Sequence, residues 1–371
     1  MKGLVVWAQS NCRSTMAFYR GLARCFNVPL LVCLRDTSNG VSVTGARVEV
    51  GFRADEFKEM KIVSVGDDYT KGCQILSTHE GWHHLFANYQ RSSIYRRLLL
   101  RVKAEGGKIA IASEAPCNMS FGWRRIAKAC YLKTLLPIKV KEVIRETEFF
   151  VNYSGNDASM AQTIGWPIRK IIPFGYFPPP LEGSKCVRRT TNKPFHILAT
   201  GAMTRYRGVD VLVDALVELM RRGIPFSATI TQKGELYDIV KRRVEFYNLP
   251  VNLTGFIPMN QLIELYQSCT VYVGSGRSEP WGMRLNDALQ CGAPLVVSRG
   301  MGGVSLVDGY RCGLAFNDAS QLADCLERLA LDESFYLHCA DNAVKAAAST
   351  TPDVKASWLV QEVRNKFSGW E

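Results

Sequence analysis

Residues 278–298 read SEPWGMRLNDALQCGAPLVVS, which predicts a loop, a helix and a strand in succession. Trp281-Gly282 opens the helix, Gly292 ends it, and Leu295-Val296-Val297 is typical of a buried strand. Glu279 lies at the mouth of the loop, and Asp287 follows it by eight positions, about two turns into the helix. Unpaired N–H groups at a helix N-terminus suit a phosphate, and carboxylates suit the vicinal hydroxyls of a ribose or a hexose. The stretch therefore predicts a site for a nucleotide sugar.

The order of motifs around this stretch resembles that of the family 4 retaining glycosyltransferases, which have the GT-B fold. The shared motifs are Glu279-Pro280-x-Gly282, the acid Asp287, Gly292-x-Pro294-x-Val296-Val297-Ser298, Gly302-Gly303 and Asp308-Gly309-x-x-x-Gly313. The family has two glutamates separated by seven residues, and this chain keeps the first and has the shorter Asp287 in place of the second. The resemblance covers residues 195–331 and is weak over the first half of the chain.

A basic loop follows the strand predicted at Phe195–Thr200 and reads GAMTRYRG from Gly201 to Gly208. The resemblance implies that Arg207 takes the place of a lysine that neutralises the diphosphate of the donor, with Arg205 assisting. An arginine fork keeps this charge and can bind two oxygens at once. Many family members have an arginine where this chain has Ala202, so one usual phosphate contact is missing. An ordinary surface charge is the alternative for Arg207.

The resemblance also implies roles for residues around the predicted helix. Glu279 would hold hydroxyls of the transferred sugar, Asp287 would hold the ribose, and the loop Gly255-Phe256-Ile257 would face the base, with Phe256 packed in the core as the alternative. Because cationic side chains and helix N-termini would stabilise the departing diphosphate, no metal and no cofactor is expected. The expected donor-binding residues are Arg205, Arg207, Gly255, Phe256, Ile257, Glu279, Trp281, Gly282, Met283 and Asp287, and the expected catalytic residues are Glu279, Arg207 and His79.

Candidate acceptor residues follow predicted strands in the first half. His79 and Glu80 come directly after a strand predicted at Gln74–Ser77. Open α/β sheets bind ligands beyond the carboxyl ends of their strands, so we expect these two residues to contact the acceptor. The alternative is a capped helix start with satisfied histidines. A metal site is disfavoured, because the sequence shows no carboxylates placed to accept hydrogen bonds from the outer ring nitrogens of His79, His83 and His84.

Other polar residues occupy similar positions in the first half. Glu114 follows a strand predicted at Lys108–Ser113, where a solvated loop residue is the alternative. Asn11 and Arg13 follow the first strand, Leu4–Trp7, at the start of a helix that Ser14 is predicted to cap. Family members often have a glycine pair in this first loop, and this chain has none.

The net charge of +12 requires an acidic partner or another explanation. Residues 91–108 and 123–141 both mix Arg and Lys with apolar and aromatic residues. A basic amphipathic helix that carries a Trp indicates an anionic membrane surface as partner, and an ordinary surface helix is the alternative. Nucleic acid is not expected, because no nucleic-acid motif accompanies the charge.

The 371 residues and their strand–helix alternation predict an α/β chain of two doubly wound, Rossmann-like domains facing across a cleft. Three prolines, Pro178 to Pro180, place the boundary between an acceptor-binding domain at 1–178, a linker at 179–193 and a nucleotide-sugar-binding domain at 194–351. In the GT-B fold a terminal helix, here within 352–371, crosses back to the first domain. No transmembrane helix or signal peptide is predicted, and the twelve scattered cysteines are typical of reduced thiols.

The resemblance implies a retaining hexosyltransferase that moves a sugar from a nucleotide sugar to a glycan acceptor in cell-surface polysaccharide or glycolipid synthesis. It also favours UDP-sugars over GDP-sugars, because they are the more frequent donors in the family, and the basic amphipathic stretches favour a lipid-linked acceptor. The expected location is cytoplasmic, peripheral on the inner face of the membrane. Two alternatives remain open: a sugar-nucleotide epimerase of the same fold, and a non-catalytic nucleotide-sugar-binding protein.

Overall fold

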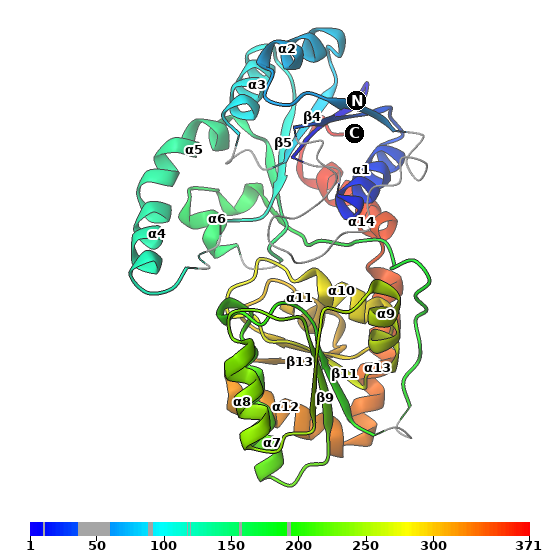
Figure 1. Cartoon of the computed structure of the whole chain (residues 1–371). Helices are drawn as coiled ribbons and strands as arrows, with labels where there is room; N and C mark the ends of the chain where they lie inside the picture. The colour runs from blue at the N-terminus through cyan, green and yellow to red at the C-terminus, as the bar shows by residue number, and fades with distance from the viewer. Residues whose placement is uncertain are drawn as a thin grey trace. The chain divides into compact units, whose positions relative to one another are not determined.

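The structure is a computed structural model that describes residues 1–9, 12–35, 60–87, 92–116, 118, 120–155, 158–190 and 194–371. It divides the chain into two compact units (Figure 1). The first unit comprises Met1–Pro179 and Pro352–Glu371, and the second comprises Pro180–Thr351. Each unit contains one parallel sheet with helices on its faces, so the predicted α/β architecture is confirmed.

The first unit has a seven-stranded sheet in the order β3-β2-β1-β4-β5-β6-β7, and its winding reverses between β1 and β4. The strands are β1 (Leu4–Ala8), β2 (Leu30–Leu34), β3 (Lys61–Ser64), β4 (His83–Ala87), β5 (Ile109–Ser113), β6 (Phe149–Asn152) and β7 (Ile171–Pro173). The helices between them are α1 (Arg13–Phe26), α2 (Tyr69–Thr78), α3 (Ser93–Ala104), α4 (Trp123–Lys133), α5 (Leu135–Glu146) and α6 (Ser159–Thr163). Strands β1, β4 and β5 are buried at every position, as helices on both faces require.

The C-terminal segment completes the first unit. Helix α14 (Pro352–Lys366) packs so closely on α1 that a Cβ added to Gly21 would lie 2.8 Å from Cβ of Ala356. Beyond this helix, the ring of Trp370 lies against Phe26 and Phe149. The predicted return of the final helix to the first domain is therefore confirmed.

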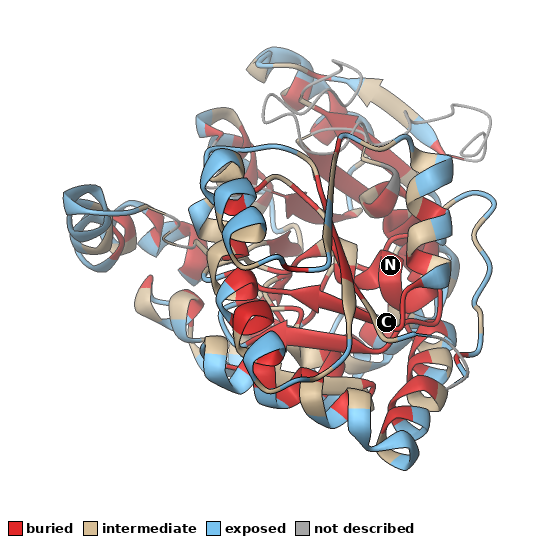
Figure 2. Ribbon diagram, turned by 60° about the horizontal axis from the view of Figure 1, so that its bottom comes forward, coloured by how far each residue is buried: buried red, intermediate tan, exposed pale blue. Residues whose placement is uncertain are grey.

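The second unit has a six-stranded sheet in the order β10-β9-β8-β11-β12-β13, and its winding reverses between β8 and β11. The strands are β8 (His196–Ala199), β9 (Ser227–Thr231), β10 (Val251–Gly255), β11 (Val271–Gly274), β12 (Leu295–Ser298) and β13 (Gly313–Phe316). The helices are α7 (Val209–Arg221), α8 (Tyr237–Phe246), α9 (Met259–Ser268), α10 (Met283–Gln290), α11 (Val304–Tyr310), α12 (Ala319–Leu331) and α13 (Glu333–Ser349). Figure 2 shows buried strands flanked by helices that have one buried and one exposed side.

Most of the expected linker, from Pro180 on, belongs to the second unit. Arg189 is only 6% exposed, and its guanidinium donates to the carbonyl oxygens of Tyr266, Gln267 and Cys291. These carbonyls lie at the C-terminal ends of α9 and α10, where unpaired acceptors and the negative end of the helix dipole stabilise a cation. Residues 191–193 of the expected linker lie outside the described residues.

Two local predictions in the first unit are wrong. Residues 74–77 belong to helix α2, which is capped by the carboxylate of Asp68 and buries Ile75 and Leu76. Their short apolar run fits a strand and a helix equally well, so its periodicity could not decide between them. At the start of α1 the N-cap is Cys12, and Ser14 is buried with its Oγ 2.7 Å from Sγ of Cys12. The stretch 36–48 that the sequence leaves unassigned lies outside the described residues.

Candidate functional site

A pocket lies in the second unit beyond the carboxyl ends of β8 and β11, where the winding of the sheet reverses. It encloses about 470 Å³ of empty space, including its open mouth. Its polar and glycine lining comes from the loop after β8, from β11 and the loop after it, and from the first turn of α10. These lining residues include Thr200, Gly201, Ala202, Arg207, Tyr272, Ser275, Gly276, Glu279, Gly282 and Arg284. Open α/β sheets bind their ligands at such switch points.

Arg207 and Glu279 form an ion pair in this pocket. Nη1 of Arg207 lies 3.8 Å from Oε1 of Glu279, and the two side chains are 16% and 18% exposed. Burial raises the pKa of Glu279, and the charge of Arg207 opposes this rise. Nε of Arg207 donates to the Tyr206 hydroxyl at 2.9 Å, which leaves the two Nη groups for Glu279 and for an incoming anion.

Backbone hydrogen bonds hold Glu279 against the loop after β12. The N–H of Glu279 donates to the carbonyl of Gly300, and its carbonyl accepts from the N–H of Gly302, both at 3.0 Å. Gly276 lies in the same loop as Glu279, after β11. A Cβ added to Gly276 would lie 3.2 Å from Oε2 of Glu279, so this loop packs tightly around the carboxylate. The position of the carboxylate is therefore defined before any ligand binds.

A close approach between two loops fixes the position of Arg207. The next residue, Gly208, has a φ of +66°, and an added Cβ would lie 1.9 Å from the carbonyl oxygen of Ser275. The Ser275 hydroxyl in turn donates to the carbonyl of Arg207 at 2.9 Å. Arg277 from the second loop binds both carboxylate oxygens of Asp210 at 2.6 and 2.7 Å. Only glycine at position 208 allows the backbone to approach the carbonyl of Ser275 this closely.

Arg284 also lines the pocket, and it was not among the residues predicted from the sequence. A Cβ added to Gly201 would lie 2.2 Å from Nη1 of Arg284, so the guanidinium occupies the space beside this glycine. A signal for this residue does exist in the sequence. An arginine in the first turn of a helix meets the positive end of the helix dipole, and α10 has no acidic residue in that turn.

The structure separates the predicted donor residues into those that line the pocket and those that do not. Arg207, Glu279 and Gly282 line it. Trp281 and Asp287 are buried, at 2% and 3% exposure, and the indole N–H of Trp281 donates to Oδ1 of Asn286 at 2.7 Å. The predicted donor residues that do not line the pocket are Arg205, Gly255, Phe256, Ile257, Trp281, Met283 and Asp287.

Phe256 is the most exposed residue of the predicted base-binding loop. Its side chain is 73% exposed, which excludes the alternative that it packs in the core. The preceding residue, Gly255, ends β10 with a φ of +69°, so the loop turns sharply at the carboxyl edge of the sheet. An exposed aromatic ring at this edge is available for stacking on a base.

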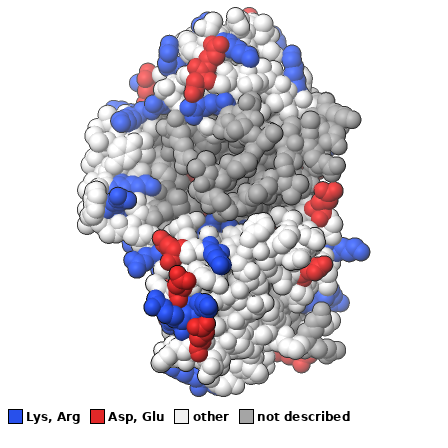
Figure 3. All heavy atoms as spheres, viewed as in Figure 1, with Lys and Arg blue, Asp and Glu red and all other residues white. Residues whose placement is uncertain are grey.

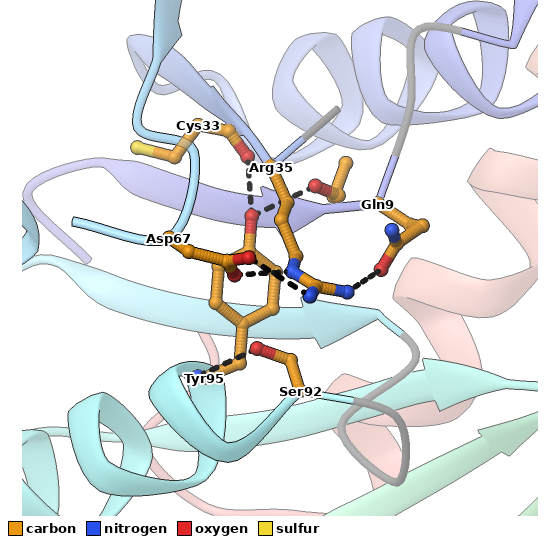
Figure 4. Close-up of polar contacts among 7 residues, drawn as sticks. Gln9, Cys33, Arg35, Asp67, Ser92 and Tyr95 are labelled. Atoms are coloured by element: carbon orange, nitrogen blue, oxygen red, sulfur yellow. Dashed lines mark hydrogen bonds and ion pairs between the residues drawn. The ribbon is translucent and has the colours of Figure 1, made fainter. Parts of the chain in front are cut away.

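At the carboxyl edge of the first sheet, Arg35 and Asp67 form an ion pair (Figure 4). Nε and Nη2 of Arg35 donate to the two carboxylate oxygens at 2.6 and 3.1 Å, and Nη1 donates to Gln9 at 3.4 Å. The Tyr95 hydroxyl donates to the carbonyl of Ala8 at the end of β1. These residues lie beside the reversal of winding in this sheet, so they are acceptor-side candidates that the sequence did not predict.

Of the predicted acceptor-side residues, Glu114 follows β5 at this same edge, as expected. Asn11 lies outside the described residues, and Arg13 is described only through its backbone, as the first residue of α1.

His79 and Glu80 lie at the opposite edge of the first sheet. They follow helix α2 and precede β4, so the prediction that they follow the carboxyl end of a strand is wrong. Nδ1 of His79 lies 2.9 Å from the carbonyl of Ile75, and its ring contacts Trp82 edge-on. His84 lies inside β4 and accepts from the indole N–H of Trp7, and burial lowers its pKa to about 3. The reason for placing His79 in catalysis is thereby removed.

Neither a metal cluster nor a membrane span is found in the described part of the chain. No three His, Cys, Asp or Glu residues in those ranges are grouped so that they could hold a metal ion. The helices of the same ranges are all too short or too polar to cross a bilayer.

Residues 187–346, which contain the whole pocket, match the family model described as Glycosyl transferases group 1. The structure of Anabaena HepE in complex with UDP is similar to this one, with a TM-score of 0.68, at 15% sequence identity and with 99% of this chain and 100% of that chain covered. The chain has the GT-B fold. Its pocket at the β8–β11 switch point belongs to the C-terminal unit of that fold.

Two curated relatives share parts of this GT-B chain. An uncharacterized glycosyltransferase of Methanocaldococcus jannaschii is 30% identical over 121 residues, which are 32% of this chain and 33% of that protein. The GDP-mannose-dependent alpha-(1-6)-phosphatidylinositol dimannoside mannosyltransferase of Mycobacterium tuberculosis is 31% identical over 116 residues, 30% of each protein. The chain thus matches about a third of the length of these relatives.

Proposed function

We propose that this protein is a retaining glycosyltransferase of the family 4 type, which moves a hexose from a nucleotide sugar to a glycan acceptor. The observation that carries the proposal is the pair of Arg207 and Glu279, held 3.8 Å apart in a pocket at the switch point of the second sheet. The match of residues 187–346 to the group 1 glycosyl transferases supports it, because this match contains the pocket.

In this proposal Arg207 binds the diphosphate of the donor and Glu279 accepts hydrogen bonds from hydroxyls of the sugar. Negative charge grows on the diphosphate when its bond to the sugar breaks, and a cation already in place lowers the energy of that state. Because Arg207 and the N–H groups at the start of α10 supply this stabilisation, the proposal includes no metal and no cofactor. It assigns no ligand contact to Trp281 or Asp287, which are buried.

UDP is the proposed nucleotide of the donor. Anabaena HepE, whose similarity extends over 99% of this chain, was solved with UDP. The Mycobacterium tuberculosis relative is named as GDP-mannose-dependent, so GDP-sugars are the alternative. Exposed Phe256 would lie on one face of either base.

The proposed acceptor is linked to a lipid, and α4 and α5 form the surface that would meet an anionic membrane. We call this surface the α4–α5 face. Trp123, Ile126, Leu135 and Ile138 are 73%, 69%, 54% and 74% exposed. In Figure 2, α4 is the helix at the far left and is pale blue on most sides. Apolar side chains of this kind enter the boundary between headgroups and acyl chains.

Basic residues accompany the apolar ones on the α4–α5 face. They are Arg124, Arg125, Lys128, Lys133, Lys139 and Lys141. Figure 3 shows Lys and Arg side chains among uncharged ones at the left, where Figure 1 places α4 and α5. Cations near an anionic surface each add to binding, so the composition of this face matches that of a peripheral membrane surface. The proposed location is therefore the cytoplasmic face of a membrane.

The other basic stretch, residues 91–108, does not form an exposed apolar surface of this kind over its described residues, 92–108. It forms α3, which buries Tyr95, Leu98, Leu99 and Val102 in the core of the first unit. The ordinary surface helix is therefore the correct interpretation of α3, and the proposal uses the α4–α5 face alone.

Incubation of the protein with UDP-sugars or GDP-sugars, with and without lipid-linked glycans, tests the proposal. Transfer to an acceptor that Glu279→Gln and Arg207→Met abolish is the expected result. Isomerisation of the sugar nucleotide without any acceptor would instead show an epimerase. Nucleotide binding without either reaction would show a binding protein.

A further inference from the structure

The loop after β8 brings one cation to the lining of the pocket, Arg207, near its C-terminal end. Gly201 and Ala202 line the pocket at the start of this loop, and the place that the resemblance gives to an arginine is taken by Ala202. Arg205, the next cation along the chain, does not line the pocket. A diphosphate bound against this loop would therefore meet only Arg207 from the segment between β8 and α7.

Arg284 reaches the same loop from another part of the chain. It lies in the first turn of α10, and it lines the pocket together with Gly201 and Ala202. A Cβ added to Gly201 would lie 2.2 Å from Nη1, 2.5 Å from Cζ and 3.0 Å from Nη2 of Arg284. The guanidinium group as a whole thus lies against the backbone of Gly201. Glycine at 201 and arginine at 284 are a matched pair, because a larger residue at 201 would displace the guanidinium.

The charges around the pocket leave Arg284 available to an anion. Three charged residues line the pocket: Arg207, Arg284 and Glu279. Glu279 pairs with Arg207 at 3.8 Å, and within the described ranges Arg284 makes no ion pair. Arg284 lies at the positive end of the α10 dipole, and this repulsion between like charges is relieved when an anion binds there. A diphosphate is the anion that the proposed function brings to this pocket.

We infer that Arg284 binds the diphosphate of the nucleotide sugar and supplies the cationic contact that Ala202 cannot make. The inference rests on the proposed function. It gives the donor site two guanidinium groups from different loops: Arg207 after β8 and Arg284 at the start of α10. Two forks can hold a diphosphate by more of its oxygens than one can.

Calorimetric titration of the full chain with UDP, GDP, uridine and guanosine tests this inference. Arg284→Met should weaken the binding of the preferred nucleoside diphosphate by about tenfold or more and leave the binding of its nucleoside unchanged. The loss should shrink at high salt, because the lost interaction is electrostatic. Arg221→Met is the matched control, since Arg221 is an exposed arginine of α7, and this variant should bind like the wild type.

A rescue experiment distinguishes a phosphate contact from a structural role. Ala202→Arg placed in the Arg284→Met variant should restore much of the affinity for the diphosphate, because it returns a cation to the same loop. Thermal melting of each variant reports whether it is folded. Wild-type affinity of folded Arg284→Met for UDP and GDP would overturn the inference and leave the proposed function standing. Failure of the wild type to bind any of these nucleotides would overturn both.

Discussion

Arg207 and Glu279 come from different loops of the second unit, and their side chains meet with Nη1 and Oε1 3.8 Å apart. The close contact of Gly208 with Ser275 positions the cation, and the hydrogen bonds of Glu279 with Gly300 and Gly302 position the acid. The pocket therefore holds a fixed cation and a fixed carboxylate, the groups that the proposed donor site requires for phosphate and for hydroxyls. Such an arrangement needs little reorganisation when charge develops on a bound ligand.

Substitution of Glu279 by Gln should change the pH dependence of both activity and stability. Burial raises the pKa of Glu279, so the carboxylate form that binds hydroxyls is lost as the pH falls through a value above the ordinary 4.5. The acid limb of the kcat/KM profile should lie at this raised pKa and should be missing from any residual activity of Glu279→Gln. An unchanged limb in the variant would contradict the assignment.

The same pKa shift gives a prediction for stability. A carboxyl group with a raised folded-state pKa binds its proton more tightly in the folded state, so wild-type stability falls as the pH rises from the unfolded value through the folded one. Glu279→Gln should therefore be more stable than the wild type at neutral pH, and this difference should disappear at low pH. Urea unfolding across the pH range measures it.

Gly208→Ala should destabilise the second unit more than Gly223→Ala does. Both glycines have a positive φ, +66° and +69°, so both variants carry the strain of a left-handed alanine, about 1–2 kcal/mol. A Cβ at 208 would also lie 1.9 Å from the carbonyl oxygen of Ser275, whereas a Cβ at 223 would meet nothing within 4 Å. Urea unfolding should show the extra loss at 208 alone, and equal losses would contradict the close approach of the two loops.

Arg189→Met should lower the free energy of unfolding by about 2–4 kcal/mol, because it leaves the carbonyls at the ends of α9 and α10 buried without their donor. The neighbouring Arg188→Met is the matched control. Arg188 pairs with Asp341 at 2.7 Å but its side chain is 75% exposed, so its loss should cost no more than about 1 kcal/mol. Chemical unfolding of both variants measures the two losses of stability. Equal losses would show that Arg189 does not stabilise the C-terminal ends of α9 and α10.

The short-range features of the proposed donor site could be predicted from the sequence. Gly292 follows the end of α10 as predicted, with a φ of +82°, because a glycine in the left-handed conformation commonly ends a helix. The position of Glu279 before α10 is equally local. Contacts between distant residues could not be predicted in this way. Arg284 reaches Gly201, and Arg189 reaches Cys291, only because the fold brings these segments together.

In the first unit, the prediction from sequence failed for a different reason. The error at residues 74–77 began with a short apolar segment, whose pattern fits both a strand and a helix. It moved His79 and Glu80 to the wrong edge of the sheet, because a strand and a helix leave the next residues at opposite ends. Arg35 and Asp67 could not be found from spacing, since they follow separate strands and meet only across the sheet edge.

A double variant on the α4–α5 face, Trp123→Ser with Ile126→Ser, should bind more weakly to vesicles that contain phosphatidylglycerol. Both side chains are exposed, so the variant should stay folded and lose only the apolar part of membrane binding. Phe246→Ser on α8 is the matched control, because Phe246 is 78% exposed in the second unit. Co-sedimentation at low and high salt measures the effect. Wild-type protein that does not bind these vesicles at low salt would contradict the membrane proposal.

The central claim is that Arg207 and Glu279 form the donor site of a glycosyltransferase, and calorimetric titration with UDP-sugars and GDP-sugars tests it most directly. The account predicts that folded wild-type protein binds one of the two classes. It also predicts that Arg207→Met weakens this binding by about tenfold or more, that Glu279→Ala weakens it as well, and that Arg221→Met does not. Binding of neither class by folded wild-type protein, or unchanged binding by the Arg207 and Glu279 variants, would contradict the claim.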